Sequence, residues 1–228
     1  MTPAPDPGLA RELPVIILPA GLEGTLALPP KPIGVVIFAH GSGSSRFSPR
    51  NRQVAAVLQR AGLGTLLFDL LTEAEAEDRR NVFDIALLGG RLVAAIDHMA
   101  AHEAVGRLPI GLFGASTGAA AALTAAAARA GRVRAVVSRG GRPDLAGEAV
   151  LGLLTAPTLL IVGGADEEVL ALNEMARAAM RCTSDLAIVP GATHLFEEPG
   201  TLDQVSRLAA DWFSRWLAPG AGQVGDRG

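Results

Sequence analysis

Ser116 is the residue of this sequence best placed to act as a nucleophile. It is the middle residue of Gly114-Ala115-Ser116-Thr117-Gly118, which follows a short apolar run and precedes an alanine-rich run typical of a helix. Small residues permit the strained backbone of a sharp strand-to-helix turn, and such a turn presents the serine hydroxyl beside a helix N-terminus. Because a glycine-rich chain produces this short pattern by chance, the interpretation depends on partner residues.

An acid and a histidine follow Ser116 along the chain. Asp166 comes shortly after an apolar run at residues 158–162, and His194 follows another at residues 186–189. A histidine takes the proton of a serine hydroxyl near neutral pH, while a carboxylate on its other ring nitrogen fixes the tautomer. The order serine, acid, histidine is typical of hydrolases whose nucleophile stands on such a turn.

The choice of the acid leaves one alternative open. Asp144 follows the preceding predicted strand and is a rival of Asp166, although it also suits the N-cap of the next helix. The histidines His98 and His102 lie within a predicted helix and His40 in a turn, which leaves His194 as the one placed to act as the base.

Acyl transfer also needs backbone donors for the developing oxyanion and groups that hold the substrate. The amide of Thr117, at the predicted helix start, is one candidate donor, and an amide in the turn around Ser42 is the other. Arg46 and Arg139 each follow a predicted strand and are candidates to bind an anionic group of the substrate, because guanidinium matches carboxylate geometry. The competing interpretation is that both are solvated surface arginines.

The segments between these residues alternate in type after an opening antiparallel hairpin. We expect strands at residues 13–18, 24–28, 33–39, 64–69, 110–113, 133–138, 158–162 and 186–189, and helices at 48–61, 80–101, 117–129, 145–151, 168–180 and 202–217. Crossovers of this length predict an α/β fold with a mainly parallel sheet of about eight strands and helices on both faces. The candidate residues then meet at the carboxyl ends of the strands, where such sheets bind ligands.

Composition limits the function classes. With 228 residues and 49% hydrophobic content, we expect a single domain at residues 13–217, a flexible N-terminus at 1–12 and a disordered tail at 218–228. The net charge of -3 is spread over the chain, which argues against a nucleic-acid or membrane partner. We expect no cofactor and no metal, and a monomer or homodimer acting on a small-molecule ester.

The single cysteine and the N-terminal segment indicate the cellular compartment of the protein. Cys182 has no second thiol with which to form an internal disulfide, which favours a reducing compartment. The first residues lack the basic start and apolar stretch of a secretory signal. We therefore expect a cytoplasmic protein.

Taken together and in order, the motifs at residues 40–45, 114–118, 163–166 and 191–194 resemble the α/β-hydrolase superfamily, in particular its dienelactone-hydrolase-like branch. The resemblance covers about residues 13–217, and it implies the α/β-hydrolase fold with Ser116, Asp166 and His194 as a catalytic triad. About twenty residues separate the strands at 133–138 and 158–162, too few for a lid domain, so we expect an open site.

Dienelactone hydrolases proper use cysteine as the nucleophile, whereas this sequence has serine at position 116. We therefore expect a serine hydrolase that cleaves small carboxylic esters through an acyl-enzyme. Thioesterase activity and lactonase or dienelactone-type activity remain alternatives, because the same acyl chemistry serves all of them. A non-catalytic binding or regulatory module of the same fold is the alternative from another class.

Overall fold

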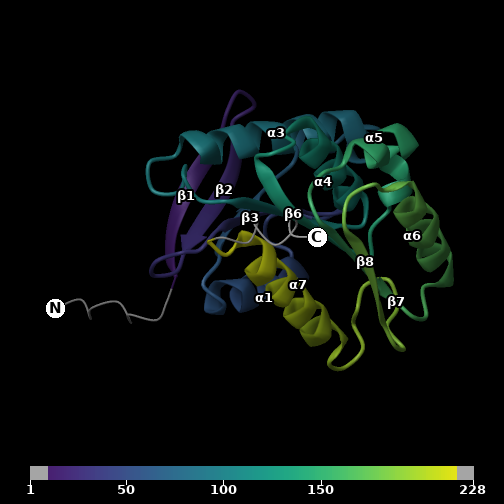
Figure 1. Cartoon of the computed structure of the whole chain (residues 1–228). Helices are drawn as coiled ribbons and strands as arrows, with labels where there is room; N and C mark the ends of the chain where they lie inside the picture. The colour runs from purple at the N-terminus through teal and green to yellow at the C-terminus, as the bar shows by residue number, and fades with distance from the viewer. Residues whose placement is uncertain (1–9, 220–228) are drawn as a thin grey trace.

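A computed structural model of the chain describes residues 10–219 (Figure 1). Its strands are β1 (Arg11–Ile17), β2 (Leu22–Leu28), β3 (Val35–Ala39), β4 (Gly64–Phe68), β5 (Ile110–Ala115), β6 (Val133–Arg139), β7 (Thr158–Gly163) and β8 (Ser184–Val189). Its helices are α1 (Pro49–Arg60), α2 (Glu73–Ala76), the 3-10 turn η1 (Asn81–Phe83), α3 (Ile85–Ala101), α4 (Thr117–Ala128), the 3-10 turn η2 (Pro143–Ala146), α5 (Glu148–Leu153), α6 (Glu167–Ala179) and α7 (Thr201–Leu217).

The strands form one sheet in the order β1-β2-β4-β3-β5-β6-β7-β8. The pairs β1·β2 and β2·β4 are antiparallel, and every pair from β4·β3 to β7·β8 is parallel. The predicted mainly parallel α/β sheet is therefore confirmed. The strand that carries Ser116, β5, lies near the middle of the sheet between β3 and β6.

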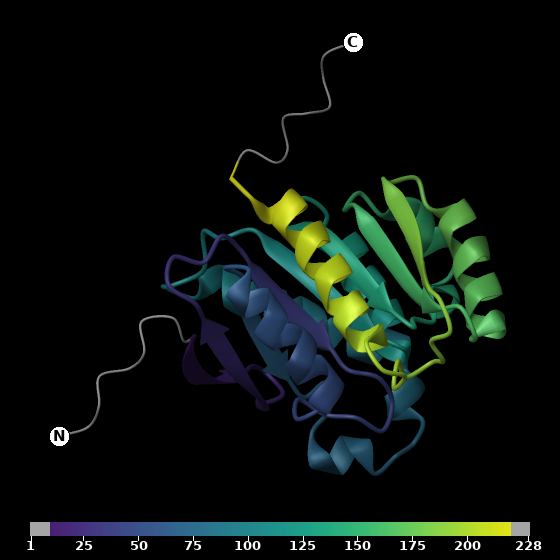
Figure 2. The same cartoon turned by 90° about the horizontal axis from the view of Figure 1, so that it is seen from below.

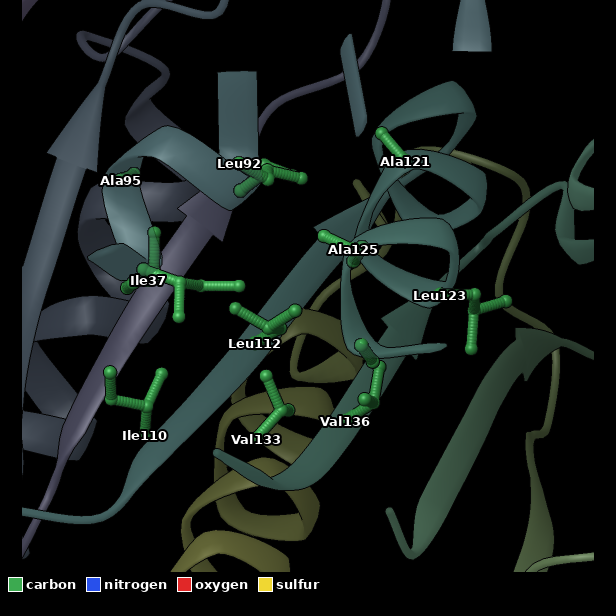
Figure 3. Close-up of a cluster of buried hydrophobic side chains, with 14 of the residues drawn as sticks. Ile37, Leu92, Ala95, Ile110, Leu112, Ala121, Leu123, Ala125, Val133 and Val136 are labelled. Atoms are coloured by element: carbon green, nitrogen blue, oxygen red, sulfur yellow. The ribbon is translucent and has the colours of Figure 1, made fainter. Parts of the chain in front are cut away.

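Helices cover both faces of the sheet. Helices α1 and α7 lie together on one face (Figure 2), while α3, α4 and α5 lie on the other (Figure 1). Alternate residues of β3 divide between the two cores: Ile37 faces α3 and α4, whereas Val36 and Phe38 face α1 and α7. Figure 3 shows Leu112 and Val136 of neighbouring strands in the first of these cores.

The expected helix at residues 80–101 is interrupted in the structure. The side chain of Asp84 accepts a hydrogen bond from the amide of Leu87 at 2.9 Å and so caps α3 at its N-terminus. The preceding residues form α2 and η1 instead, with a capping box between Thr72 and Glu75. This short excursion follows β4 and lines a cavity next to the turn after β3.

Other boundaries differ by a few residues. Strand β1 begins at Arg11 and β8 at Ser184, each two residues before the expected start. Between β6 and β7 the chain carries only η2 and α5, which agrees with the expected lack of a lid. The predictions for residues 1–12 and 218–228 lie mostly outside the described residues, and the single domain at 13–217 stays a prediction. Within the described part of the chain, no helix combines the length and the apolar composition needed to cross a bilayer.

Candidate active site

Ser116 occupies a strained turn between β5 and α4. Its backbone has φ 51° and ψ -124°, in a region that residues other than glycine rarely adopt. The Ser116 amide donates to the carbonyl of Arg139 at 3.3 Å, and the Ser116 carbonyl accepts from Arg142 at 3.1 Å. The turn is thus held from both sides by the chain that leaves β6.

The glycines on either side of Ser116 are required by close approach of the backbone. A Cβ atom at Gly114 would lie 2.4 Å from the Cα of Ala119, and one at Gly118 would lie 2.3 Å from the carbonyl oxygen of Ala39. No side chain fits at these distances. The sequence pattern around Ser116 is therefore a packing requirement of the turn.

The structure brings the three candidate triad residues together. His194 Nε2 lies 3.3 Å from Ser116 Oγ, and His194 Nδ1 lies 2.7 Å from Asp166 Oδ2. With a proton on Nδ1 donated to the carboxylate, Nε2 is free to accept the proton of the serine hydroxyl. Asp144, the alternative acid, is instead bound by Arg142, whose Nε lies 2.9 Å from Asp144 Oδ1.

The loops that carry Asp166 and His194 are docked to each other through backbone groups. The amide of Ala165 donates to the carbonyl of Ala192 at 2.9 Å, and a Cβ at Gly163 would lie 2.3 Å from that same oxygen. The two loops follow the neighbouring parallel strands β7 and β8. Their contact fixes the relative position of acid and base.

Sequence reasoning missed Glu198, which braces the histidine loop. Its carboxylate accepts hydrogen bonds from the hydroxyl of Thr193 at 2.6 Å and from the Thr193 amide at 3.1 Å. The hydroxyl of Thr193 holds the pKa of Glu198 below its usual value. No pattern in the sequence separates this glutamate from the neighbouring Glu197, because only the folded loop sets which carboxylate faces Thr193.

The turn after β3 lies against Ser116, as expected for the second side of an oxyanion site. A Cβ at Gly41 would lie 3.1 Å from the Cβ of Ser116. The amide of Thr117 is at the first position of α4, where no carbonyl of the helix can accept from it. The amide of Ser42 donates to the side-chain oxygen of Thr117 at 3.0 Å. An oxyanion that binds this amide must therefore displace the Thr117 oxygen or share the amide hydrogen with it.

His40 ties this turn to the end of β4. Its Nδ1 donates to the carbonyl of Gly41 at 3.0 Å, and its Nε2 accepts from the amide of Leu70 at 3.1 Å. This pattern requires a neutral ring, and burial lowers the pKa of His40. Sequence reasoning assigned His40 to the turn but did not find this second contact.

The structure places the two candidate substrate-binding arginines differently. The Arg46 guanidinium is bound to Asp69 and Glu23, each at 2.5 Å, so a substrate anion would compete with two carboxylates. Arg139 is 7% exposed, and its Nε has no partner among the described residues. Burial, followed by the charge of Arg50, lowers the pKa of Arg139 to about 10. Substrate binding by either arginine stays a prediction.

A cavity of about 900 Å³ opens beside the turn after β3. Its wall includes Ser42 and the exposed Phe47, together with Leu71 after β4 and Val82 of η1. The three candidate triad residues are not part of this wall, which includes the turn at residues 41–43. The wall is mixed apolar and polar, as in many cavities that bind small molecules.

The sequence pattern of the α/β-hydrolase domain matches residues 32–212. The chain belongs to the α/β-hydrolase family. This agrees with the fold and with the turn at Ser116. The match extends from just before β3 into α7 and includes every candidate site residue.

Relatives of this α/β-hydrolase point to the dienelactone-hydrolase-like branch. The crystal structure of a dienelactone hydrolase from Anabaena variabilis is 52% identical, with a TM-score of 0.89 over 92% of this chain and 99% of that one. The Est1E protein of Butyrivibrio proteoclasticus shares the fold at 16% identity, with a TM-score of 0.74 over 92% of this chain and 99% of that one.

Two curated Mycobacterium tuberculosis proteins, from strains CDC 1551 and H37Rv, are 59% identical over 211 residues. Both are named as phosphoribosyl transferases, and the names mark this assignment as provisional. The matched region covers 92% of this chain but only 47% of theirs, so this chain spans about half the length of these relatives.

Proposed function

We propose that this α/β-hydrolase cleaves small carboxylic esters through a covalent acyl-enzyme at Ser116. The observation that carries the proposal is the chain of contacts from Ser116 Oγ to His194 Nε2 and from His194 Nδ1 to Asp166. Membership of a hydrolase family supports it. The lack of a lid between β6 and β7 favours small ester substrates.

In the first half of the reaction, Ser116 Oγ attacks the ester carbonyl while His194 Nε2 takes the serine proton. The charge that appears on the carbonyl oxygen is met by the Thr117 amide and by an amide of the turn at residues 41–43. The imidazolium is stabilised by Asp166 and then protonates the leaving alcohol. The ester C–O bond breaks, and the acyl group remains on Ser116.

In the second half, a water molecule takes the place of the alcohol. His194 removes its proton as the water oxygen attacks the acyl-enzyme, and the same proton returns to Ser116 as the acid product leaves. No redox step is involved, so atoms and charge balance with water as the only co-reactant. The lone Cys182 leads us to infer a cytoplasmic location for this chemistry.

The decisive experiment is the Ser116→Ala variant, assayed with p-nitrophenyl acetate and butyrate. We expect turnover to fall by about a thousandfold or more, because loss of a triad nucleophile removes the covalent route. Ser214→Ala, a serine of α7 remote from the turn, is the matched control and should keep full activity. A fluorophosphonate probe should label wild type but not Ser116→Ala. Full ester turnover by Ser116→Ala would exclude the proposal.

Lactone hydrolysis is the second candidate, because a 52% identical structure is named a dienelactone hydrolase. The same triad would open a lactone ring without releasing a separate alcohol. A panel of short esters, thioesters and lactones, compared by kcat/KM, distinguishes these classes. If none of the panel is turned over and Ser116 is not labelled, a non-catalytic binding module becomes the better description.

A further inference from the structure

A second cavity of about 900 Å³ lies at the amino ends of the parallel strands, whereas Ser116 lies at the carboxyl end of β5. It is formed where the chain enters β3, β5 and β6 and where α7 ends (yellow in Figure 2). Its wall consists of Lys31, Pro32, Ile33, Arg107, Leu108, Pro109, Gly131, Arg132, Arg134, Trp216, Leu217, Ala218 and Pro219. We call this cavity the basal groove.

The charged residues in the wall of the basal groove are all cations. Lys31, Arg107, Arg132 and Arg134 line it, and no aspartate or glutamate does. Within residues 10–219, none of the four forms an ion pair. This concentration of positive charge stands out in a chain whose net charge is -3.

Two buried hydrogen-bond donors of the wall residues lack an acceptor among the described residues. One guanidinium nitrogen of Arg132 donates to the carbonyl of Gly106 at 2.7 Å. Arg132 Nε and Trp216 Nε1 are buried without an acceptor among the described residues. Both nitrogens lie beneath the surface of the wall, where donors without acceptors are rare and costly.

Lys31, in the wall of the groove, has a strained backbone conformation. Its φ is 53°, in the left-handed region, although the following residue is Pro32 and a residue before proline favours an extended backbone. Such strain costs on the order of 1 kcal/mol or more and is concentrated at functional positions. The strained backbone places a cation at the groove.

We propose that the basal groove binds a multiply charged oxyanion, carried by phosphate or carboxylate groups. Guanidinium groups match the oxygen geometry of both, and neighbouring cations favour a ligand with more than one negative charge. A groove of this volume exceeds the size of a single inorganic phosphate, which leaves room for a larger phosphorylated or polycarboxylic molecule. The site is separate from Ser116 and does not depend on the proposed esterase activity.

A structural explanation competes with this proposal. Helix α7 ends at Leu217 in the wall of the groove, and cations stabilise helix C-termini through the helix dipole. That effect acts within the last turn of a helix, whereas Arg134 belongs to β6 and Lys31 to the loop before β3. The helix dipole therefore does not explain these two residues, which are the ones to change.

The test is calorimetric titration of the full chain with pyrophosphate at constant ionic strength, alongside inorganic phosphate and citrate. Lys31→Gln combined with Arg134→Gln removes two exposed cations whose side chains form no hydrogen bond or ion pair with the described residues. Arg177→Gln combined with Arg181→Gln, on and just after α6, removes the same charge elsewhere. We expect affinity for pyrophosphate to fall about tenfold or more in the first pair, as two charge-assisted contacts are lost, and to stay unchanged in the second.

Ser116→Ala should bind pyrophosphate like the wild type, which separates the basal groove from the active site. Tighter binding of pyrophosphate than of citrate would identify phosphate as the ligand group, and the reverse would identify carboxylate. The proposal is overturned if wild type binds neither anion, or if the Lys31 and Arg134 pair binds as tightly as the Arg177 and Arg181 pair.

Discussion

At the scale of single residues, the candidate site depends as much on the partners of each side chain as on its type. Ser116, His194 and Asp166 have the types and the order that acyl transfer needs, and the structure adds the contacts. Arg46 shows the converse, since its charge is already matched by Asp69 and Glu23. Residue type suggested anion binding for Arg46, but its neighbours indicate a tie between β2, the turn after β3 and the end of β4.

The identity of the acid can be tested by comparing two aspartates. We expect Asp166→Asn to lower kcat by about a thousandfold or more, because the amide no longer stabilises the imidazolium. Asp144→Asn is the matched control and should change kcat little, since Asp144 contacts Arg142 and not His194. Equal losses in the two variants would remove Asp166 from its proposed role.

Thr117 provides a second test at this scale. Thr117→Val keeps the shape of the side chain but deprives the Ser42 amide of its acceptor, which costs about 0.5–1.5 kcal/mol for a typical hydrogen bond. We expect a lower kcat with little change in KM, because the turn beside Ser116 loosens. Thr117→Ser should restore kcat. An unchanged kcat in Thr117→Val would show that this hydrogen bond does not position the turn.

At the scale of elements, α4 is positioned by its lack of bulky side chains. Residues from Thr117 to Ala126, with the exception of Thr124, are buried, and most are alanine. These small residues let the start of α4 approach the ends of β3 and β5, which brings the turn at residues 41–43 against Ser116. The approach to the sheet, and not intrinsic helix propensity alone, explains the composition of this helix.

Two glycines in helices test this argument. Gly118→Ala would place a Cβ 2.3 Å from the carbonyl oxygen of Ala39, so we expect a loss of about 1–3 kcal/mol or more in the free energy of unfolding, together with lower activity. Gly90→Ala, in α3, meets nothing within 4 Å and should increase stability by about 0.5–1 kcal/mol. Urea denaturation of both variants measures the difference, and a harmless Gly118→Ala would contradict the packing argument.

At the scale of the whole molecule, the histidine that joins β3 to β4 makes stability depend on pH. Burial lowers the pKa of His40 in the folded state below the ordinary value of 6.5, which the unfolded chain retains. At a pH between the folded and the unfolded pKa, the unfolded chain therefore binds more protons than the folded one. Stability from His40 is therefore complete above pH 6.5 and is lost as the pH falls through the lowered folded pKa. Glu75 and Asp97, whose pKa values are lowered by hydrogen bonds, add to the loss at still lower pH.

We expect the urea midpoint of the wild type to fall between about pH 7.5 and about pH 5.5, before these carboxylates begin to titrate. His40→Gln should be less stable at the higher pH and should show a smaller fall. Burial and the charge of His102 also lower the pKa of His98, so His98→Gln serves as the comparison and should retain the part of the fall that comes from His40. A wild-type midpoint that stays constant over this range would contradict the assignment.

Much of the architecture could be predicted because local patterns of apolar residues indicate the strands and helices. Runs of apolar residues separated by helical periods identified all eight strands and the alternation that forces a parallel sheet. The helix expected at residues 80–101 was predicted less well, because the Asp84 cap competes with the helical pattern on either side of it. Boundaries near such caps depend on one hydrogen bond and are hard to read from periodicity.

The residues at the carboxyl ends of the strands could be identified from the sequence, because chain order and the handedness of crossovers leave few arrangements of a parallel sheet. Which of those residues touch follows from the folded structure alone. It pairs Asp166 with His194, gives Asp144 to Arg142 and Arg46 to Asp69 and Glu23, and gathers Lys31, Arg107, Arg132 and Arg134 at one groove. Such contacts join residues far apart in the chain, and their distances follow from packing that no local pattern records.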